Sequence, residues 1–118
     1  MVSLVFSLIE HIKDVFKIDP LEFKSKIRGA DAILIATPEY NYSIPGVLKN
    51  AIDFASRPYG DNPFNDKPVA IVSASIGMLG GAKTRYHLRQ KIIFLNMYPM
   101  NRLTTQSHLC ILLILATC

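Results

Sequence analysis

The sequence is poor in cysteine, and its two cysteines form no recognised motif. Cys110 and Cys118 both lie near the carboxyl end, at a spacing that matches no metal-binding or redox pattern. The chain is therefore not expected to be a disulfide-rich secreted domain, and a reducing, cytoplasmic setting is favoured. Because His11 and His108 have no accompanying pattern of metal ligands, we expect no metal site.

Long apolar runs and blocks of like charge are also missing. The first ten residues are apolar but lack the basic leader and the small-residue cleavage pattern of a signal peptide. The apolar stretch 109–116 is far shorter than the ~20 residues that a membrane helix needs. The net charge of +4 comes from scattered residues, so neither a membrane nor a nucleic acid is expected as a partner.

What the sequence does have is enough apolar content for a folded core. Of its 118 residues, 50% are hydrophobic and 19% are charged, which is typical of a globular chain rather than a disordered one. No internal repeat, low-complexity stretch or interdomain linker is visible. We therefore expect one soluble domain.

Hydrophobic periodicity predicts helices that alternate with short strands. The first helix is expected to begin after Asp19, a good amino-terminal cap before Pro20, and to end at Gly29. The predicted elements are a helix over Pro20–Arg28, a strand over Ala32–Thr37, a helix over Val47–Ser56, a strand over Val69–Ser75 and a helix over Ala82–Met97 that Pro99 ends. Both strands are apolar runs without alternation, as in strands that are covered on both faces. This order implies right-handed crossovers and a parallel sheet, which is the α/β class.

Two of the helices have apolar residues that can pack on the sheet. In the second helix they are Val47, Leu48, Ala51, Ile52, Phe54 and Ala55, and in the third they are Tyr86, Leu88, Ile92, Ile93 and Leu95. The amino-terminal segment has two interpretations, because its apolar residues fit a strand over positions 2–8 and helical spacing over positions 5–16. The later half of that segment fits a helix better.

The two predicted strands end in loops that carry polar groups. In an open parallel sheet, ligands bind beyond the carboxyl ends of the strands, where Thr37–Asn41 and Ser75–Gly81 emerge. If the strands are neighbours, their ends lie roughly 5 Å apart. The two loops are therefore expected to form the walls of one site for a flat ring system.

The first loop has the chemistry of a ring-binding segment. Pro38 restricts the backbone and removes one donor, Tyr40 offers a flat amphipathic face, and Asn41 offers donors and an acceptor. These groups suit a heterocycle with a polar pyrimidine edge. The alternative is that Pro38 and Asn41 only form a tight turn.

The second loop permits a competing interpretation. Residues 77–84, GMLGGAKT, differ at one position from the phosphate loop G-x-x-x-x-G-K-[ST]. Ala82 stands where that motif needs glycine, and neither strand ends in an acidic residue that would help to hold magnesium, so nucleotide hydrolysis is disfavoured. Gly77, Gly80 and Gly81 suit a close approach of the backbone to a ring. Ordinary turn glycines are the alternative, above all for Gly81.

A known signature matches the stretch that follows the first strand. Residues 37–58, TPEYNYSIPGVLKNAIDFASRP, closely resemble that of the NADPH-dependent FMN reductase family, flavodoxin-like enzymes that include chromate and quinone reductases. The resemblance continues through KPVAIVSASIGMLGGAKTRYHLRQ to Met100 and Asn101, and it spans about residues 27–102.

The resemblance implies an FMN-dependent oxidoreductase. The residues that would contact the flavin ring and its ribityl chain are Pro38, Glu39, Tyr40 and Asn41, and those that would line its other side are Ser75 and Gly77. In the ping-pong scheme of the family, NADPH or NADH reduces the flavin and a quinone or similar acceptor then takes two electrons. No catalytic side chain is implied, because the cofactor carries the chemistry.

The same resemblance implies a homodimer or a homotetramer. Lys49, Asn50 and Asp53 lie on a helix that is similar to the dimer-forming helix of the family, with solvent-exposed positions as the alternative. A further tetramer contact would involve Lys83, Arg85, Tyr86 and Arg89. We expect His87 to be an interface or packed histidine rather than a catalyst.

Both ends depart from the family pattern. The family begins with a strand, a phosphate loop of the type G-S-x-R-x-x-S, a helix and a second strand, whereas Met1–Lys17 contains no glycine and no such pattern. We therefore expect an incomplete flavodoxin-like sheet that lacks the first strand, the FMN phosphate cradle and the second strand. The strand at 32–37 would then lie at an edge unless Met1–Ser7 pairs with it. The tail is also atypical, and Leu109–Ala116 forms either a substitute strand or an unrelated terminus.

These departures leave a second hypothesis open. The chain is either an enzyme or a non-catalytic relative that acts only by association with full-length subunits. The enzyme is favoured because both loops match the family. Residues 1–118 are thus expected to form a single partial flavodoxin-like domain with atypical termini at 1–19 and 103–118.

Overall fold

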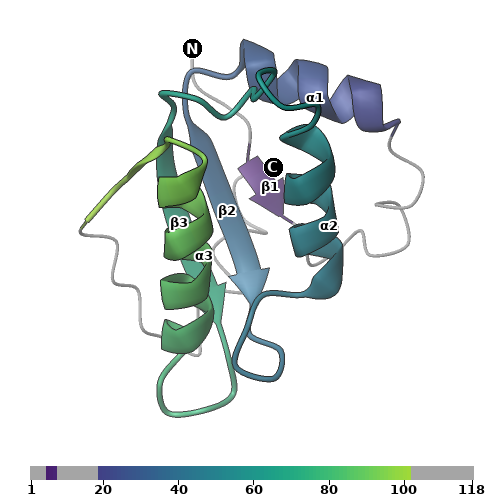
Figure 1. Cartoon of the computed structure of the whole chain (residues 1–118). Coiled ribbons are helices and arrows are strands. Elements are labelled where there is room, and N and C mark those ends of the chain that lie inside the picture. The colour runs from purple at the N-terminus through teal and green to yellow at the C-terminus, as the bar shows by residue number, and fades with distance from the viewer. Residues whose placement is uncertain (1–4, 8–18, 102–118) are drawn as a thin grey trace.

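The computed structural model describes residues 5–7 and 19–101 (Figure 1). In chain order it contains β1 (Val5–Ser7), α1 (Pro20–Gly29), β2 (Ile33–Pro38), α2 (Gly46–Ala55), β3 (Pro68–Ala74), α3 (Ala82–Phe94) and β4 (Tyr98–Pro99). The predicted helices and strands are confirmed to within one residue at every boundary except the end of α3. The helix expected in the later half of the amino-terminal segment, and the strand considered for 109–116, lie outside the described residues.

The strands form one parallel sheet in the order β1-β2-β3-β4. β2 and β3 pair along their length, and Pro38 lies opposite Ala74 at the carboxyl end. On the other side of β2, Val5–Ser7 pairs in parallel with residues 34–36. The alternative in which amino-terminal residues pair with this strand is therefore confirmed for Val5–Ser7, and β2 does not lie at the edge of the sheet.

Local sequence sets the boundaries of α1. The Asp19 carboxylate accepts a hydrogen bond from the Leu21 N–H at 3.0 Å, and Pro20 takes the first helical position, where a missing N–H leaves no bond unmade. Lys26 and Arg28 lie in the last turn, where positive charge interacts favourably with the helix dipole. The signals that predicted this helix are therefore the ones that form it.

Helices α2 and α3 lie in front of the sheet in Figure 1. The crossovers β2-α2-β3 and β3-α3-β4 step across the sheet in the same direction, so right-handed connections place both helices on one face. Along β3, the buried residues Val69, Ile71 and Ser73 alternate with the half-buried residues Ala70, Val72 and Ala74. The prediction that this strand is covered on both faces is therefore confirmed for one face and only partly for the other, which is half-buried.

The core lies between the sheet and the helices. Its members include Leu48, Ile52 and Ala55 from α2, Leu88 and Ile92 from α3, and Ile33, Ile35, Val69 and Ile71 from the strands. Three residues that were predicted to be available for packing are exposed instead: Phe54 (51%), Tyr86 (69%) and Ile93 (61%). Each helix contacts the core along one stripe, and these three side chains lie outside it.

The third helix ends at Phe94, three residues before the predicted end at Met97. Asn96 adopts φ 57°, a left-handed conformation that asparagine tolerates better than most residues and that commonly ends helices. The Met97 N–H still donates to the Ile92 carbonyl at 3.1 Å, and Pro99 then lies in β4 rather than ending the helix. None of the described helices is long and apolar enough to cross a membrane.

Four polar side chains at the amino end of the sheet bond to one another or to nearby backbone carbonyls, in a group that we call the amino-end cluster: Lys24, Arg28, Asp61 and Lys67. Lys24 is buried, pairs with Asp61 at 2.9 Å and donates to the Arg57 carbonyl. Arg28 also pairs with Asp61, and Lys67 Nζ donates to two carbonyls at the end of α1, at 3.1 and 2.5 Å. The hydrogen bond from Lys24, together with the positive charge of Arg28, lowers the pKa of Asp61.

Candidate ligand-binding site

Two loops meet at the carboxyl end of the sheet, at the bottom of Figure 1. The β2–α2 loop covers residues 39–45 and the β3–α3 loop covers residues 75–81. They follow Pro38 and Ala74, which are register partners on neighbouring strands, and the Glu39 N–H donates to the Ala74 carbonyl at 3.0 Å. The predicted juxtaposition of the two loops is therefore confirmed.

The β2–α2 loop is a tight turn with exposed side chains. Tyr40 and Ser43 exchange two backbone hydrogen bonds of 3.0 Å each, and between them Asn41 and Tyr42 have φ values of 50° and 62°. Positive φ is uncommon outside glycine, and residues held in such conformations cluster at functional sites. Asn41 therefore forms part of a turn, and its side chain and that of Tyr40 are also exposed to bind a ligand.

The β3–α3 loop is more open to solvent. Its internal bonds are short-range: the Gly77 N–H donates to Ser75 Oγ at 3.3 Å, and the Gly80 N–H donates to the Gly77 carbonyl at 3.0 Å. Ile76 and Met78 are almost completely exposed. Ser75 is half-buried and Gly77 is exposed, so both are accessible to a bound molecule.

Two glycines of this loop differ in what surrounds them. A Cβ on Gly81 would lie 2.6 Å from Ser73 Oγ and 2.8 Å from Ser73 Cβ, and Gly81 has φ +78°. Its backbone therefore approaches β3 closely, and the Ser73 hydroxyl donates to the Gly81 carbonyl at 3.0 Å. A Cβ on Gly77 would meet only Ser75 Oγ, at 3.7 Å. The fold thus requires glycine at position 81 and does not require it at position 77.

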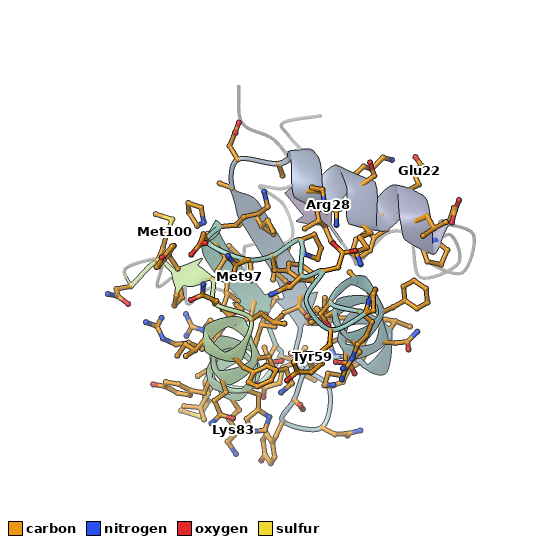
Figure 2. All side chains as sticks on the ribbon, turned by 45° about the horizontal axis from the view of Figure 1, so that its top comes forward. Glu22, Arg28, Tyr59, Lys83, Met97 and Met100 are labelled. Carbon is orange, nitrogen blue, oxygen red and sulfur yellow. The ribbon has the colours of Figure 1, made fainter. Side chains whose placement is uncertain are left out.

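Three contacts fasten the β2–α2 loop to the start of α3. They are the bond from the Thr84 N–H to Glu39 Oε2 (3.1 Å), the pair of Ser43 Oγ and His87 Nδ1 (3.1 Å), and the placement of Lys83 Nζ 3.1 Å from the centroid of the Tyr42 ring. Figure 2 shows Lys83 on α3, far from Glu22 and Arg28 on α1.

The prediction of a packed His87 is wrong, because this side chain is exposed and contacts a loop hydroxyl. Its alternative role at an interface stays a prediction.

Sequence reasoning did not identify Thr84, Ser43 or Ser73 as part of this arrangement. One signal for Thr84 was present, because α3 begins after Gly81, which has no side chain to cap the helix, and the first N–H groups of a helix need acceptors. The acceptor that the structure provides is the Glu39 carboxylate. In a phosphate loop, the amides at this helix start would bind phosphate instead. The bond to Glu39 therefore weighs further against the phosphate-loop interpretation.

The loops together offer a defined set of groups to a ligand. These are the exposed ring of Tyr40, the amide of Asn41, the hydroxyl of Ser75 and the unhindered backbone at Gly77. An aromatic face with amide donors and acceptors suits a flat heterocycle that has polar edges. Within residues 5–7 and 19–101, no group of three potential metal-ligating side chains is gathered in one place.

Comparison with known proteins agrees with this chemistry. The family model described as NADPH-dependent FMN reductase matches residues 7–108. The chain is 59% identical over 80 residues to an NAD(P)H-dependent FMN reductase of Pseudomonas aeruginosa, covering 68% of this chain and 43% of that protein. It is 54% identical over 77 residues to a quinone reductase of Escherichia coli, covering 65% and 40%. The chain thus spans about two fifths of the length of these relatives.

Solved structures show the same relationship. The flavoenzyme FerB, an NAD(P)H:(acceptor) oxidoreductase from Paracoccus denitrificans, matches with a TM-score of 0.71 and 36% identity, covering 86% of this chain and 59% of that one. An NADPH-quinone reductase from P. pentosaceus matches with a TM-score of 0.58 at 17% identity over 86% and 82% of the two chains, which shows a common fold alone. The flavodoxin-like α/β fold, the two adjoining loops and the family match over residues 7–108 identify this chain as a member of the NADPH-dependent FMN reductase family.

Proposed function

We propose that this chain binds FMN and acts as an oxidoreductase that transfers two electrons from NAD(P)H to a quinone or similar acceptor. The observation that carries the proposal is the adjacency of the two loops, which the 3.0 Å bond between the Glu39 N–H and the Ala74 carbonyl holds together. Residues on both loops can therefore reach one flat ring. The names of relatives such as the quinone reductase of Escherichia coli support the acceptor class.

The proposed cofactor contacts divide between the loops. From the first they are Pro38, Glu39, Tyr40 and Asn41, and from the second they are Ser75 and Gly77. Tyr40 and Asn41 offer an aromatic face and an amide, and Gly77 offers a backbone that a ring can approach because no side chain intervenes. The residues fit the ring of FMN.

The protein's part in the proposed reaction is binding and orientation. Bound FMN would supply the redox chemistry, in which NAD(P)H gives up two electrons and a quinone takes them in a separate step. The loops would hold the ring at the carboxyl end of the sheet and leave one face open for each of the two partners in turn. We assign no catalytic side chain.

The FMN phosphate has no matching cradle in this sequence. Met1–Lys17 lacks the glycine-containing phosphate motif of the family, and a hydrogen bond to a charged group is worth about 1.5–3 kcal/mol. We therefore expect the ring to supply most of the affinity. Riboflavin, which has the same ring without the phosphate, should bind within about tenfold of FMN, a difference below roughly 1.4 kcal/mol.

The test is a fluorescence titration of the purified chain with FMN and with riboflavin. The wild type should quench and saturate with both ligands. Gly77→Ala should weaken both by about tenfold or more, because a methyl group would stand where the ring approaches the backbone, a cost of at least roughly 1.4 kcal/mol. Quinone-dependent oxidation of NADPH by the reconstituted chain then tests the electron transfer.

Gly29→Ala is the matched control. Gly29 ends α1, away from the loops, and a Cβ there meets nothing within 4 Å. Both variants should melt like the wild type, and only Gly77→Ala should lose flavin. A folded wild type that binds neither ligand, or equal affinities in all three proteins, would overturn the proposal.

Two further features belong to the proposal. We expect the protein to work in the cytoplasm as a homodimer or homotetramer, with Lys49, Asn50 and Asp53 of α2 at the dimer contact. On the surface of α2, Lys49 already pairs with Asp53, and Phe54 next to it is half exposed. Size-exclusion chromatography with light scattering measures the subunit number directly.

A further inference from the structure

Helix α3 begins without a capping side chain of its own. Its amino-terminal cap is Gly81, which adopts a left-handed conformation and has no side chain to accept from the first N–H groups. Those amides need acceptors from elsewhere, because a helix leaves its first four N–H groups unbonded. For Thr84 the acceptor comes from 45 residues earlier in the chain, since its N–H donates to Glu39 Oε2 at 3.1 Å.

The same glutamate also bonds to the other end of the β3–α3 loop. That loop begins after Ala74 and ends before Ala82. The Glu39 N–H donates to the Ala74 carbonyl at 3.0 Å, at the start of the loop, and the Glu39 carboxylate accepts from Thr84, just past its end. Glu39 therefore spans the base of the loop that contains Ser75 and Gly77.

The charge of Glu39 suits this place. A carboxylate at the amino terminus of a helix interacts favourably with the positive end of the helix dipole. A carboxylate that accepts from a backbone N–H also forms a charge-assisted bond, which is stronger than a neutral one. The bonds within the loop join residues two or three apart, such as the bond between Gly77 N–H and Ser75 Oγ. The Ser73 hydroxyl also joins the two ends, because it donates to the Gly80 and Gly81 carbonyls at 3.3 and 3.0 Å. Of these contacts, the one from Glu39 is the charged bond and the one that reaches into α3.

We infer that Glu39 is a positioning residue that fixes the shape of the β3–α3 loop through Thr84, and that flavin affinity depends on it through that loop. The second half of this inference rests on the proposed function, because the loop is expected to line the ring. The first half concerns the ligand-free protein alone. Glu39 then acts on the ring chiefly through Ser75 and Gly77.

The experiment measures hydrogen exchange of backbone amides in the ligand-free protein. In Glu39→Ala the Thr84 amide loses its acceptor and should exchange about tenfold faster or more, as expected from losing a charged hydrogen bond, while amides in α1 and α2 should be unchanged. In Glu39→Gln the side-chain carbonyl can still accept from Thr84 but carries no charge, so exchange should lie between that of the wild type and that of Glu39→Ala. Glu39→Asp keeps the charge but is one methylene shorter, and it should behave like the alanine variant.

Flavin binding gives the second measurement. Riboflavin affinity should fall in Glu39→Ala and Glu39→Asp and should recover in part in Glu39→Gln, because this variant keeps the hydrogen bond to Thr84 but loses the charge. Glu22→Ala on α1 is the control, because it removes an exposed acid whose partner is Lys26, and it should change neither readout. A variant that lost global stability alone would accelerate exchange in all the helices, not at Thr84 selectively.

The outcomes separate the two proposals. Unchanged Thr84 exchange in both Glu39→Ala and Glu39→Asp would overturn the positioning role, even if the wild type binds flavin. Faster Thr84 exchange with undiminished riboflavin affinity would overturn the link between the loop and the ligand. If the wild type binds no flavin but Thr84 exchange responds as expected, the proposed function fails while the structural role of Glu39 stands. Should Glu39→Ala not fold, the comparison of the aspartate and glutamine variants decides the matter.

Discussion

The two ends of the sheet use their polar groups in different ways. At the amino end, the members of the amino-end cluster bond to one another and to backbone carbonyls, as Lys24 does with Asp61 and Arg57. At the carboxyl end, Tyr40, Asn41 and Gly77 face solvent. Figure 2 shows labelled residues from both regions, with Arg28 on α1 and Lys83 near the loops. The polar groups at the amino end thus bond to partners within the protein, whereas the carboxyl end keeps groups available for a ligand.

The difference has a structural cause. The connection from α2 to β3 contains Asp61, which pairs with Lys24 and Arg28 of α1. It also contains Lys67, which donates to a carbonyl at the carboxyl end of α1, where the negative end of the dipole attracts cations. The two loops at the carboxyl end instead leave neighbouring parallel strands and enter helices, and such positions are where α/β proteins bind ligands. Changes at the amino end should therefore alter stability alone, and changes in the loops should separate stability from binding.

The largest expected effect on stability is at Gly81, a residue of the carboxyl-end loops that the fold itself requires. Gly81→Ala places a methyl group 2.6 Å from Ser73 Oγ at a positive φ, and we expect a loss of at least about 2 kcal/mol in the free energy of unfolding. Chemical denaturation measures it. Gly77→Ala in the same loop should change that free energy by less than about 0.5 kcal/mol. Equal losses of unfolding free energy in the two variants would contradict the distinction between Gly81, which the packing of the loop requires, and Gly77, which is free to face a ligand.

A smaller loss is expected from the amino-end cluster. Lys24→Met keeps the length of the side chain but removes its bonds to Asp61 and the Arg57 carbonyl, and should cost about 1–3 kcal/mol. The control is Lys26→Met, whose exposed pair with Glu22 should contribute less than about 1 kcal/mol. Flavin affinity should stay unchanged in both. A Lys24→Met protein that unfolds like the wild type would show that this end is not held by its polar bonds.

A third prediction uses two buried threonines near the loops. Thr84 Oγ1 has no hydrogen-bond partner among the described residues, whereas Thr37 Oγ1 donates to the Pro38 carbonyl at 3.1 Å. Thr84→Val should therefore stabilise the protein by about 1 kcal/mol, and Thr37→Val should destabilise it by about as much. Thermal and denaturant unfolding of the two variants measure the sign of each change in stability. A destabilised Thr84→Val would mean that its hydroxyl has a partner in solution, such as a water molecule.

Much of the fold could be predicted because its signals are local. Asp19 and Pro20 start α1 through contacts within one turn, and the apolar run before Pro38 forms β2. The adjacency of the two loops followed from the rule for parallel sheets. The roles of Pro38 and Asn41 toward a cofactor stay predictions.

What the sequence did not predict depends on contacts between distant residues. The exposed faces of Tyr86 and Ile93 are set by the stripe along which α3 meets β3, which periodicity alone does not locate. The bond from Thr84 to Glu39 joins residues 45 apart. Likewise, the need for glycine at position 81 comes from Ser73 on the neighbouring strand. These contacts become visible only once the strands are paired.

The smallest expected effect is the pH dependence of the amino-end cluster. Lys24 and Arg28 lower the pKa of Asp61 below its ordinary value of 3.8, so the ionised carboxylate stabilises the folded state at pH values above that figure. This contribution is lost as the pH falls through 3.8 and then through the lower pKa of the folded state. Asp61 of the unfolded chain takes up a proton first, and Asp61 of the folded chain takes one up at a lower pH. The melting temperature of Asp61→Asn should therefore lie below that of the wild type at pH 7, and this gap between the two melting temperatures should narrow toward pH 3. In a Lys24→Met background the gap at pH 7 should already be smaller, since the bond from Lys24 is the largest cause of the shift. A gap that is the same at both pH values and in both backgrounds would mean that Asp61 supports its loop by shape rather than by charge, and the contrast between the two ends of the sheet would then lose its electrostatic basis.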